Sequence, residues 1–181
     1  FVKNENKLSF YTYAEFDIET NLFSDREEAT MMSLFMPGRK PGDVSKLFTV
    51  VVRSFLGGVS DDMARAQINS ITKEQLGTDK EHIDPDGKPV LTKDKKPVIL
   101  NDYKDFNIED ELVFVDNDLQ AWQVTFKRLH EWSPDFLSIW NMEFEMDKYV
   151  EMCEHDNVDP AEMFSDPRGP GAYRCFSYKK G

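Results

Sequence analysis

Two acidic clusters, far apart in the sequence, carry the residues of this chain that could do chemistry. The first is Asp17-Ile18-Glu19, near the end of a segment (8–18) that is rich in aromatic and β-branched residues and free of Gly and Pro. Such a segment predicts a β-strand. Residues two apart on a strand share a face, so the two carboxylates project side by side. A hard cation such as Mg²⁺ or Mn²⁺ between them would make this arrangement favourable. The alternative is an acidic strand end that faces water, because the chain contains 34 acidic residues.

The second cluster opens a helix that we expect to begin at Asn141, directly after a predicted buried strand at residues 136–140. Glu145 and Asp147 lie near the start of this helix. Helix starts beside strand ends are common places for a site in an α/β sheet, so carboxylates here can converge on the first cluster. Residues two apart on a helix do not share a face. We therefore expect at most one of Glu145 and Asp147 to serve with the first cluster.

The elements that must position these clusters follow from the hydrophobic patterns. Segments 8–18, 29–36 and 46–55 predict three strands joined by short turns, which indicates an antiparallel meander. The remaining elements are helices at about 60–76, from Asp116 or Asn117 to Ser133-Pro134 and from Asn141 onward, with strands at 111–115, 136–140 and 173–178. Strands and helices that alternate after a meander predict an α/β fold, with strand 136–140 parallel to the first strand.

A polar stretch at residues 57–107 reads as an insertion into this core. Its first part predicts a helix that starts after a capping Ser60 and carries acids in its first turn. We expect the inner face of that helix to consist of Met63, Ala66, Ile68 and Ile71. Further on, Asp84-Pro85-Asp86-Gly87 predicts a tight turn that opens a β-hairpin, with a tip at 93–97 and a returning strand at 98–100.

Composition bounds the function. The net charge of −12 over 181 residues argues against a domain that binds nucleic acid mainly through its phosphates. It leaves open an enzyme that holds its substrate through divalent metal, with basic surface supplied by a neighbouring domain. Cys153 and Cys175 form no metal or redox pattern, so we expect two free thiols in a reducing compartment. Without a signal peptide or an apolar span, we expect a soluble, intracellular protein with no membrane partner.

Both clusters resemble motifs of a known family. Phe16-Asp17-Ile18-Glu19-Thr20 is similar to the first motif, Asp-x-Glu, of the ribonuclease-H-like 3′-5′ exonucleases of the DEDD superfamily. Residues 134–144, PDFLSIWNMEF, are similar to the approach to the second motif, which in family B DNA polymerases often reads Pro-Asp-x-x-x-x-Trp-Asn before Phe-Asp. The order of the motifs, the meander and the polar insertion are similar to the proofreading domain of phage-type family B polymerases over residues 8–155.

The resemblance implies an α/β, ribonuclease-H-like sheet and a 3′-5′ exonuclease that uses two divalent cations, Mg²⁺ or Mn²⁺. Asp17 would bridge the two ions, about 4 Å apart. Glu19 would bind the ion that activates water, and Glu145 or Asp147 would hold the second ion. The substrate would be the single-stranded 3′ end of DNA.

The same resemblance suggests the side chains that contact substrate. Leu22 or Phe23, just beyond the first motif, would wedge against the terminal base, because apolar and aromatic faces stack on single strands. A place in the core or on the surface is the alternative for both. Asn141 would orient the helix start or contact substrate, and Phe144 of the second motif would line the substrate site.

The chain departs from the family in two places. The family has Asp after the Phe of its second motif, whereas Glu145 follows Phe144 here. Its third motif, Tyr-x-x-x-Asp or His-x-x-x-x-Asp, normally lies well downstream of the second, and neither pattern occurs within residues 145–181. We therefore expect a fragment of a longer protein, partnered by the remaining polymerase domains, in the cytoplasm of an infected host if phage-encoded. Two other hypotheses stay open: a catalytically inactive exonuclease-like structural module of a replication protein, and a stand-alone nuclease.

Overall fold

The structure, a computed structural model, describes residues 11–40, 42–76, 80–100 and 107–177. Its centre is a five-stranded mixed sheet with the strand order β6-β3-β2-β1-β7. The antiparallel meander consists of β1 (Tyr13–Thr20), β2 (Ala29–Met36) and β3 (Val44–Val52). The two flanking strands are parallel to their neighbours: β7 (Phe136–Ile139) to β1, and β6 (Asn107–Val115) to β3. The predicted α/β class, the meander and the parallel strand are confirmed, and the arrangement is compatible with a ribonuclease-H-like fold.

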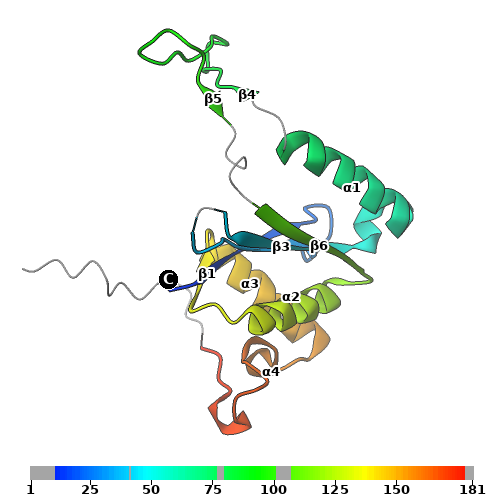
Figure 1. Cartoon of the computed structure of the whole chain (residues 1–181). Helices are drawn as coiled ribbons and strands as arrows, with labels where there is room; N and C mark the ends of the chain where they lie inside the picture. Colours follow the sequence, from blue (N-terminus) through cyan, green and yellow to red (C-terminus); the bar gives the residue numbers. More distant parts are fainter. Residues whose placement is uncertain (1–10, 41, 77–79, 101–106, 178–181) are drawn as a thin grey trace, which may run out of the picture.

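Helices cover both faces of the sheet (Figure 1). On one face, α1 (Asp61–Leu76) packs over β3 and β6. On the other lie α2 (Asp118–Trp132), α3 (Met142–Asp156) and the short α4 (Pro160–Phe164). Two 3₁₀ turns complete the described elements, η1 (Arg53–Leu56) and η2 (Gly171–Tyr173).

Aromatic packing fixes α2 and α3 against β1. Trp122 of α2 is fully buried, and its ring centroid lies 5.6 Å from Phe16 of β1, 5.6 Å from Phe126 and 5.1 Å from Tyr149 of α3. Phe126 in turn lies 5.2 Å from Tyr149, edge to face. Large rings packed in this way dominate the energetics of a core. The strand that carries Asp17 and the helix that carries Glu145 are thus held through one cluster.

The ends of α2 follow the predicted signals. The Asn117 side chain accepts a hydrogen bond from the Gln120 backbone amide at 2.9 Å, as an N-cap residue does. Ser133 adopts a left-handed conformation with φ 50°, and its amide donates to the Leu129 carbonyl. Pro134 follows and cannot continue the helix. The two cysteines are free thiols, as predicted.

The predicted inner face of α1 is wrong in three of its four residues. Among the described side chains of α1, the apolar ones that pack on the sheet are Ala64, which is buried, and Ile68, one turn later. Met63 and Ile71 are 66% and 46% exposed, and Ala66 is exposed as well. Because the small Ala64 packs on the sheet, the helix is rotated so that the larger apolar side chains of Met63 and Ile71 face away from it.

Several strand predictions also need correction. β1 starts at Tyr13, after an irregular Tyr11 and Thr12, whereas residues 8–10 lie outside the described part. β3 ends at Val52, where η1 begins. The strand expected to be buried at 136–140 is an edge strand, so Phe136 is 58% exposed, and Trp140 lies beyond its end. The region 173–177 holds the end of η2 and no strand, and residue 178 lies outside the described part.

The polar stretch forms a hairpin with the predicted tip, where Leu91 and Pro97 make an antiparallel bridge, but the returning strand at 99–100 pairs with residues that precede the tight turn. Strands β4 (Lys80–Glu81) and β5 (Ile99–Leu100) pair as a separate two-stranded sheet, apart from the main sheet in Figure 1. The tight turn is closed by a 2.9 Å hydrogen bond from the Gly87 amide to the Asp84 carbonyl. Gly87 has φ 80°, which glycine adopts without strain. The bounds of the insertion, 57–107, stay a prediction. Helix α1 lies within them but packs on the main sheet, so it is not separate from the core.

Replacing Phe126 by Ala tests the aromatic cluster. Because its ring is 1% exposed and touches β1, α2 and α3, we expect Phe126→Ala to lower the free energy of unfolding by about 3–5 kcal/mol in urea titrations. Tyr173→Ala, at a residue 80% exposed, should change it by less than about 0.5 kcal/mol. Equal effects of the two variants would contradict this description of the core.

Candidate functional site

The register of the sheet places the first acidic cluster on a partly open face. Asp17 pairs with Ser33, Ser33 with Thr49 and Thr49 with Leu112, so these four residues form one row across the sheet. Leu112 lies under α1, at the β6 end of the row. Asp17 and Glu19, at the β1 end, are exposed. The acidic pair therefore occupies the half of this face that α1 does not cover.

The structure brings Glu145 to Asp17. Glu145 lies in the first turn of α3 and is 2% exposed, although it is charged in its ordinary state. Its carboxyl group faces that of Asp17 closely enough for the two to share a hydrogen bond when one of them is protonated. Two of the acidic residues singled out by the sequence, far apart along the chain, thus meet in the folded protein.

Burial and the charge of Asp17 change the chemistry of Glu145. Burial makes the carboxylate costly, the negative charge of Asp17 adds to that cost, and together they raise the pKa of Glu145 to about 7. A hydrogen bond from the Asn141 backbone acts in the opposite direction. Glu145 therefore keeps its proton up to near neutral pH unless a cation takes the place of that proton.

The oxygen atoms of Glu145 are incompletely paired. Among the described residues, its Oε2 atom is buried without a hydrogen-bond partner. A buried oxygen of this kind is costly unless a proton or a cation satisfies it. Mg²⁺ keeps several waters and needs only one or two carboxylates from a protein, so Asp17 and Glu145 fit its donor requirements. No third His, Cys, Asp or Glu joins them in a ready metal-binding group within the part of the chain that the structure describes.

The other two predicted ligands lie nearby in the sequence. Glu19 is exposed on the same face of β1, beside a register irregularity between Glu19 and Thr20. The Thr30 hydroxyl donates to the Glu19 carbonyl at 3.1 Å and so holds this irregular step in place. Bulges of this kind re-aim side chains and are frequent next to active sites. Asp147 is half-buried on α3, two residues beyond Glu145.

The predicted substrate residues divide into exposed and packed ones. Leu22 and Phe23 are 73% and 100% exposed in the loop between β1 and β2. Asn141 is exposed at the start of α3, where its carbonyl accepts a hydrogen bond from the Glu145 amide at 3.0 Å. Phe144 is half-buried against the core, with the Lys148 ammonium 5.7 Å from its ring centroid. Trp140, which the sequence did not predict as a substrate residue, is 97% exposed directly before Asn141.

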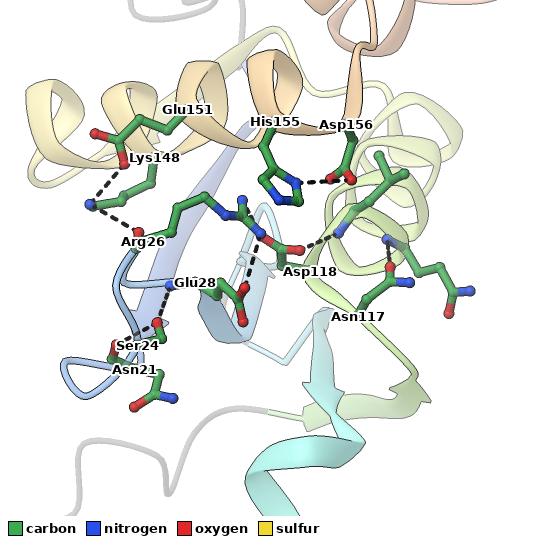
Figure 2. A network of polar contacts seen from close by, with 12 residues as sticks. Asn21, Ser24, Arg26, Glu28, Asn117, Asp118, Lys148, Glu151, His155 and Asp156 are labelled. Atoms are coloured by element: carbon green, nitrogen blue, oxygen red, sulfur yellow. Dashed lines mark hydrogen bonds and ion pairs between the residues drawn. The ribbon is translucent and has the colours of Figure 1, made fainter.

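Charged side chains hold the loop between β1 and β2 against the helices, as Figure 2 shows. Arg26 contacts Asp118 at the start of α2 at 2.8 Å, with side chains only 19% and 8% exposed. Lys148 of α3 lies 3.1 Å from Glu27 and 3.5 Å from the Arg26 carbonyl. The loop that presents Leu22 and Phe23 is thus tied to both helices that flank the site. Sequence spacing gave no signal for these contacts, because the partners come from distant elements.

The comparisons with known proteins leave the chain without a family. Neither the models of known protein families nor the curated proteins give a match to its sequence. Within the described residues, no helix is both long enough and apolar enough to cross a bilayer.

Replacing Glu145 by Gln tests the burial of its charge. Because the folded state raises the pKa of Glu145 to about 7 from 4.5, the wild-type protein should lose stability as the pH rises from about 4.5 through 7. Glu145→Gln should remove this loss and raise the free energy of unfolding at pH 8 by roughly 1–3 kcal/mol, with little effect at pH 4. Urea titrations at both pH values measure it.

Glu154→Gln, the same change at an exposed position of α3, is the matched control and should leave the pH profile unchanged. A Glu145→Gln variant less stable than wild type at pH 8 would show that the carboxylate is well accommodated as a charge.

Proposed function

We propose that this chain is a 3′-5′ exonuclease domain of a DNA polymerase of family B. It would remove nucleotides from the 3′ end of single-stranded or frayed DNA by hydrolysis of the phosphodiester bond with two divalent cations, Mg²⁺ or Mn²⁺. The observation that carries the proposal is the meeting of Asp17 and Glu145, one from each of the two motifs that resemble this family. The mixed sheet, with the first motif on its central meander, supports it.

In this proposal the acidic residues hold the cations, which when bound supply an activated water and stabilise the leaving 3′ oxygen. Asp17 would be the ligand common to both cations, Glu145 would hold one of them, and Glu19 would add a carboxylate from the same face of β1. The raised pKa of Glu145 means that cation binding displaces a proton from the pair, so binding strengthens as the pH rises through about 7.

The neighbouring loops would position the strand. Phe23, fully exposed and presented by a braced loop, offers a face on which the terminal base can stack. Trp140, just before the start of α3, offers a second exposed ring. Asn141 positions Glu145 through its backbone hydrogen bonds.

A second function has one observation in its favour. Glu145 stands where the family motif has Asp, which favours a catalytically inactive module that retains the fold as a scaffold in a replication protein. Such a module would not degrade DNA under any metal condition.

Degradation of a 5′-labelled single-stranded oligonucleotide with Mn²⁺ or Mg²⁺ tests the proposal. Asp17→Asn should lower the rate by at least about 100-fold, because a shared ligand is lost, whereas Asp25→Asn, an exposed residue of the adjoining loop, should leave it unchanged. Glu145→Asp, which restores the residue of the family motif, should retain or raise activity. A folded wild-type protein that trims no oligonucleotide in either metal would favour the scaffold.

A further inference from the structure

Three exposed aromatic residues lie close together near the start of β1, on the face of the sheet that carries Asp17. Tyr11, Tyr13 and Phe136, here called the aromatic platform, are 66%, 44% and 58% exposed. The Tyr11 and Phe136 rings lie 5.3 Å apart in an edge-to-face contact. Tyr13 pairs with Phe136 in the parallel register of β1 and β7, so their side chains are neighbours on one face. Three large rings left together in water indicate a binding surface.

The platform lies on the same face as the acidic residues. Tyr13 and Asp17 are four residues apart on β1, an even spacing, and both alternate with the buried Ala14 and Phe16. Four residues of strand span roughly 13 Å. The surface from the platform to Asp17 is therefore one continuous strip of β1.

A cationic group borders the platform. A small pocket of about 150 Å³ is lined by Tyr11, Thr12, Tyr13, Pro37, Gly38 and Arg39. Arg39 is exposed in the loop between β2 and β3. Thr12 is fixed between the two tyrosines by hydrogen bonds from its amide and hydroxyl to Asp135, at 2.7 and 2.8 Å. The pocket thus combines aromatic faces, one guanidinium group and a backbone that is held in place.

We propose that the aromatic platform, with Arg39, is a second binding site for single-stranded nucleic acid, which holds the nucleotides upstream of the 3′ end. This inference rests on the proposed function and adds the length of strand that the protein recognises. Aromatic rings accept bases of any sequence by stacking, and Arg39 complements a phosphate. A single strand suits this site because its bases are unpaired and free to stack on the rings.

The distance from the aromatic platform to Asp17 determines how many nucleotides the protein would bind. Stacked nucleotides advance about 3.4 Å each, so roughly 13 Å corresponds to about four nucleotides, and fewer in an extended strand. A strand with its 3′ terminal nucleotide at Asp17 would place its third to fifth nucleotides on the platform. Glu15, exposed on β1 between the platform and Asp17, repels the phosphates on this path.

Fluorescence anisotropy of labelled oligothymidylates with the full chain in Ca²⁺ tests the platform. Wild-type affinity should rise steeply between (dT)₂ and (dT)₆ and then level off. Tyr13→Ala and Phe136→Ala should each weaken (dT)₈ binding about fivefold or more and leave (dT)₂ binding unchanged. Tyr13→Phe and Phe136→Tyr, which keep the rings, should bind as wild type, and Glu15→Gln should bind (dT)₈ more tightly.

Tyr173→Ala, which removes an exposed tyrosine elsewhere, is the control for a general loss of aromatic surface. Unchanged (dT)₈ affinity in Tyr13→Ala and Phe136→Ala, or no binding of (dT)₈ by the wild type, would overturn the platform. Hydrolysis of thymidine 5′-p-nitrophenyl phosphate in Mn²⁺ separates the two proposals. Its loss in Asp17→Asn but not in Phe136→Ala supports the cleavage site independently of the platform, and a wild type inert to this ester counts against the exonuclease alone.

Discussion

The close approach of two carboxyl groups, Asp17 from β1 and the buried Glu145 from α3, is the constraint on which the site depends. Two negative charges in such a place are unfavourable unless a proton or a cation lies between them. The fold supports the pair from behind: the ring of Trp122 packs on Phe16 and Tyr149, so the strand and the helix cannot separate without opening the core. An electrostatically unfavourable contact is thus kept by apolar packing, which is how strain persists at functional sites.

Two surfaces border the pair of Asp17 and Glu145: a loop held by ion pairs and an accessible strip of β1. Arg26 and Lys148 hold the loop that presents Phe23, and the buried charge of Asp118 makes this attachment costly to break. On the face that carries Asp17, the described side chains of α1 pack with residues of β3 and β6 and with Met31 of β2. The strip of β1 from Tyr13 to Asp17 therefore stays accessible.

The sequence predicted the architecture better than the details of packing. The order of strands and helices followed from periodicity and from signals such as Asn117 and Ser133-Pro134, and the two acidic clusters were recognised by their place after strands. Local patterns carry no information on rotation or on edges, so the inner face of α1 was assigned to Met63 and Ile71, and Phe136 was expected to be buried. The choice between Glu145 and Asp147 depended on the turn of α3 that faces Asp17. The contacts of Arg26 and Lys148 join distant elements, which no spacing rule reveals.

Titration of Mn²⁺ binding by electron paramagnetic resonance tests most directly whether the pair is a cation site. We expect saturable binding at pH 8 that weakens at pH 6, as Glu145 takes up its proton, and that is lost in Asp17→Asn and in Glu145→Gln. Asp25→Asn should bind as wild type. Saturable binding that survives in both Asp17→Asn and Glu145→Gln, or no saturable binding at pH 8, would contradict it.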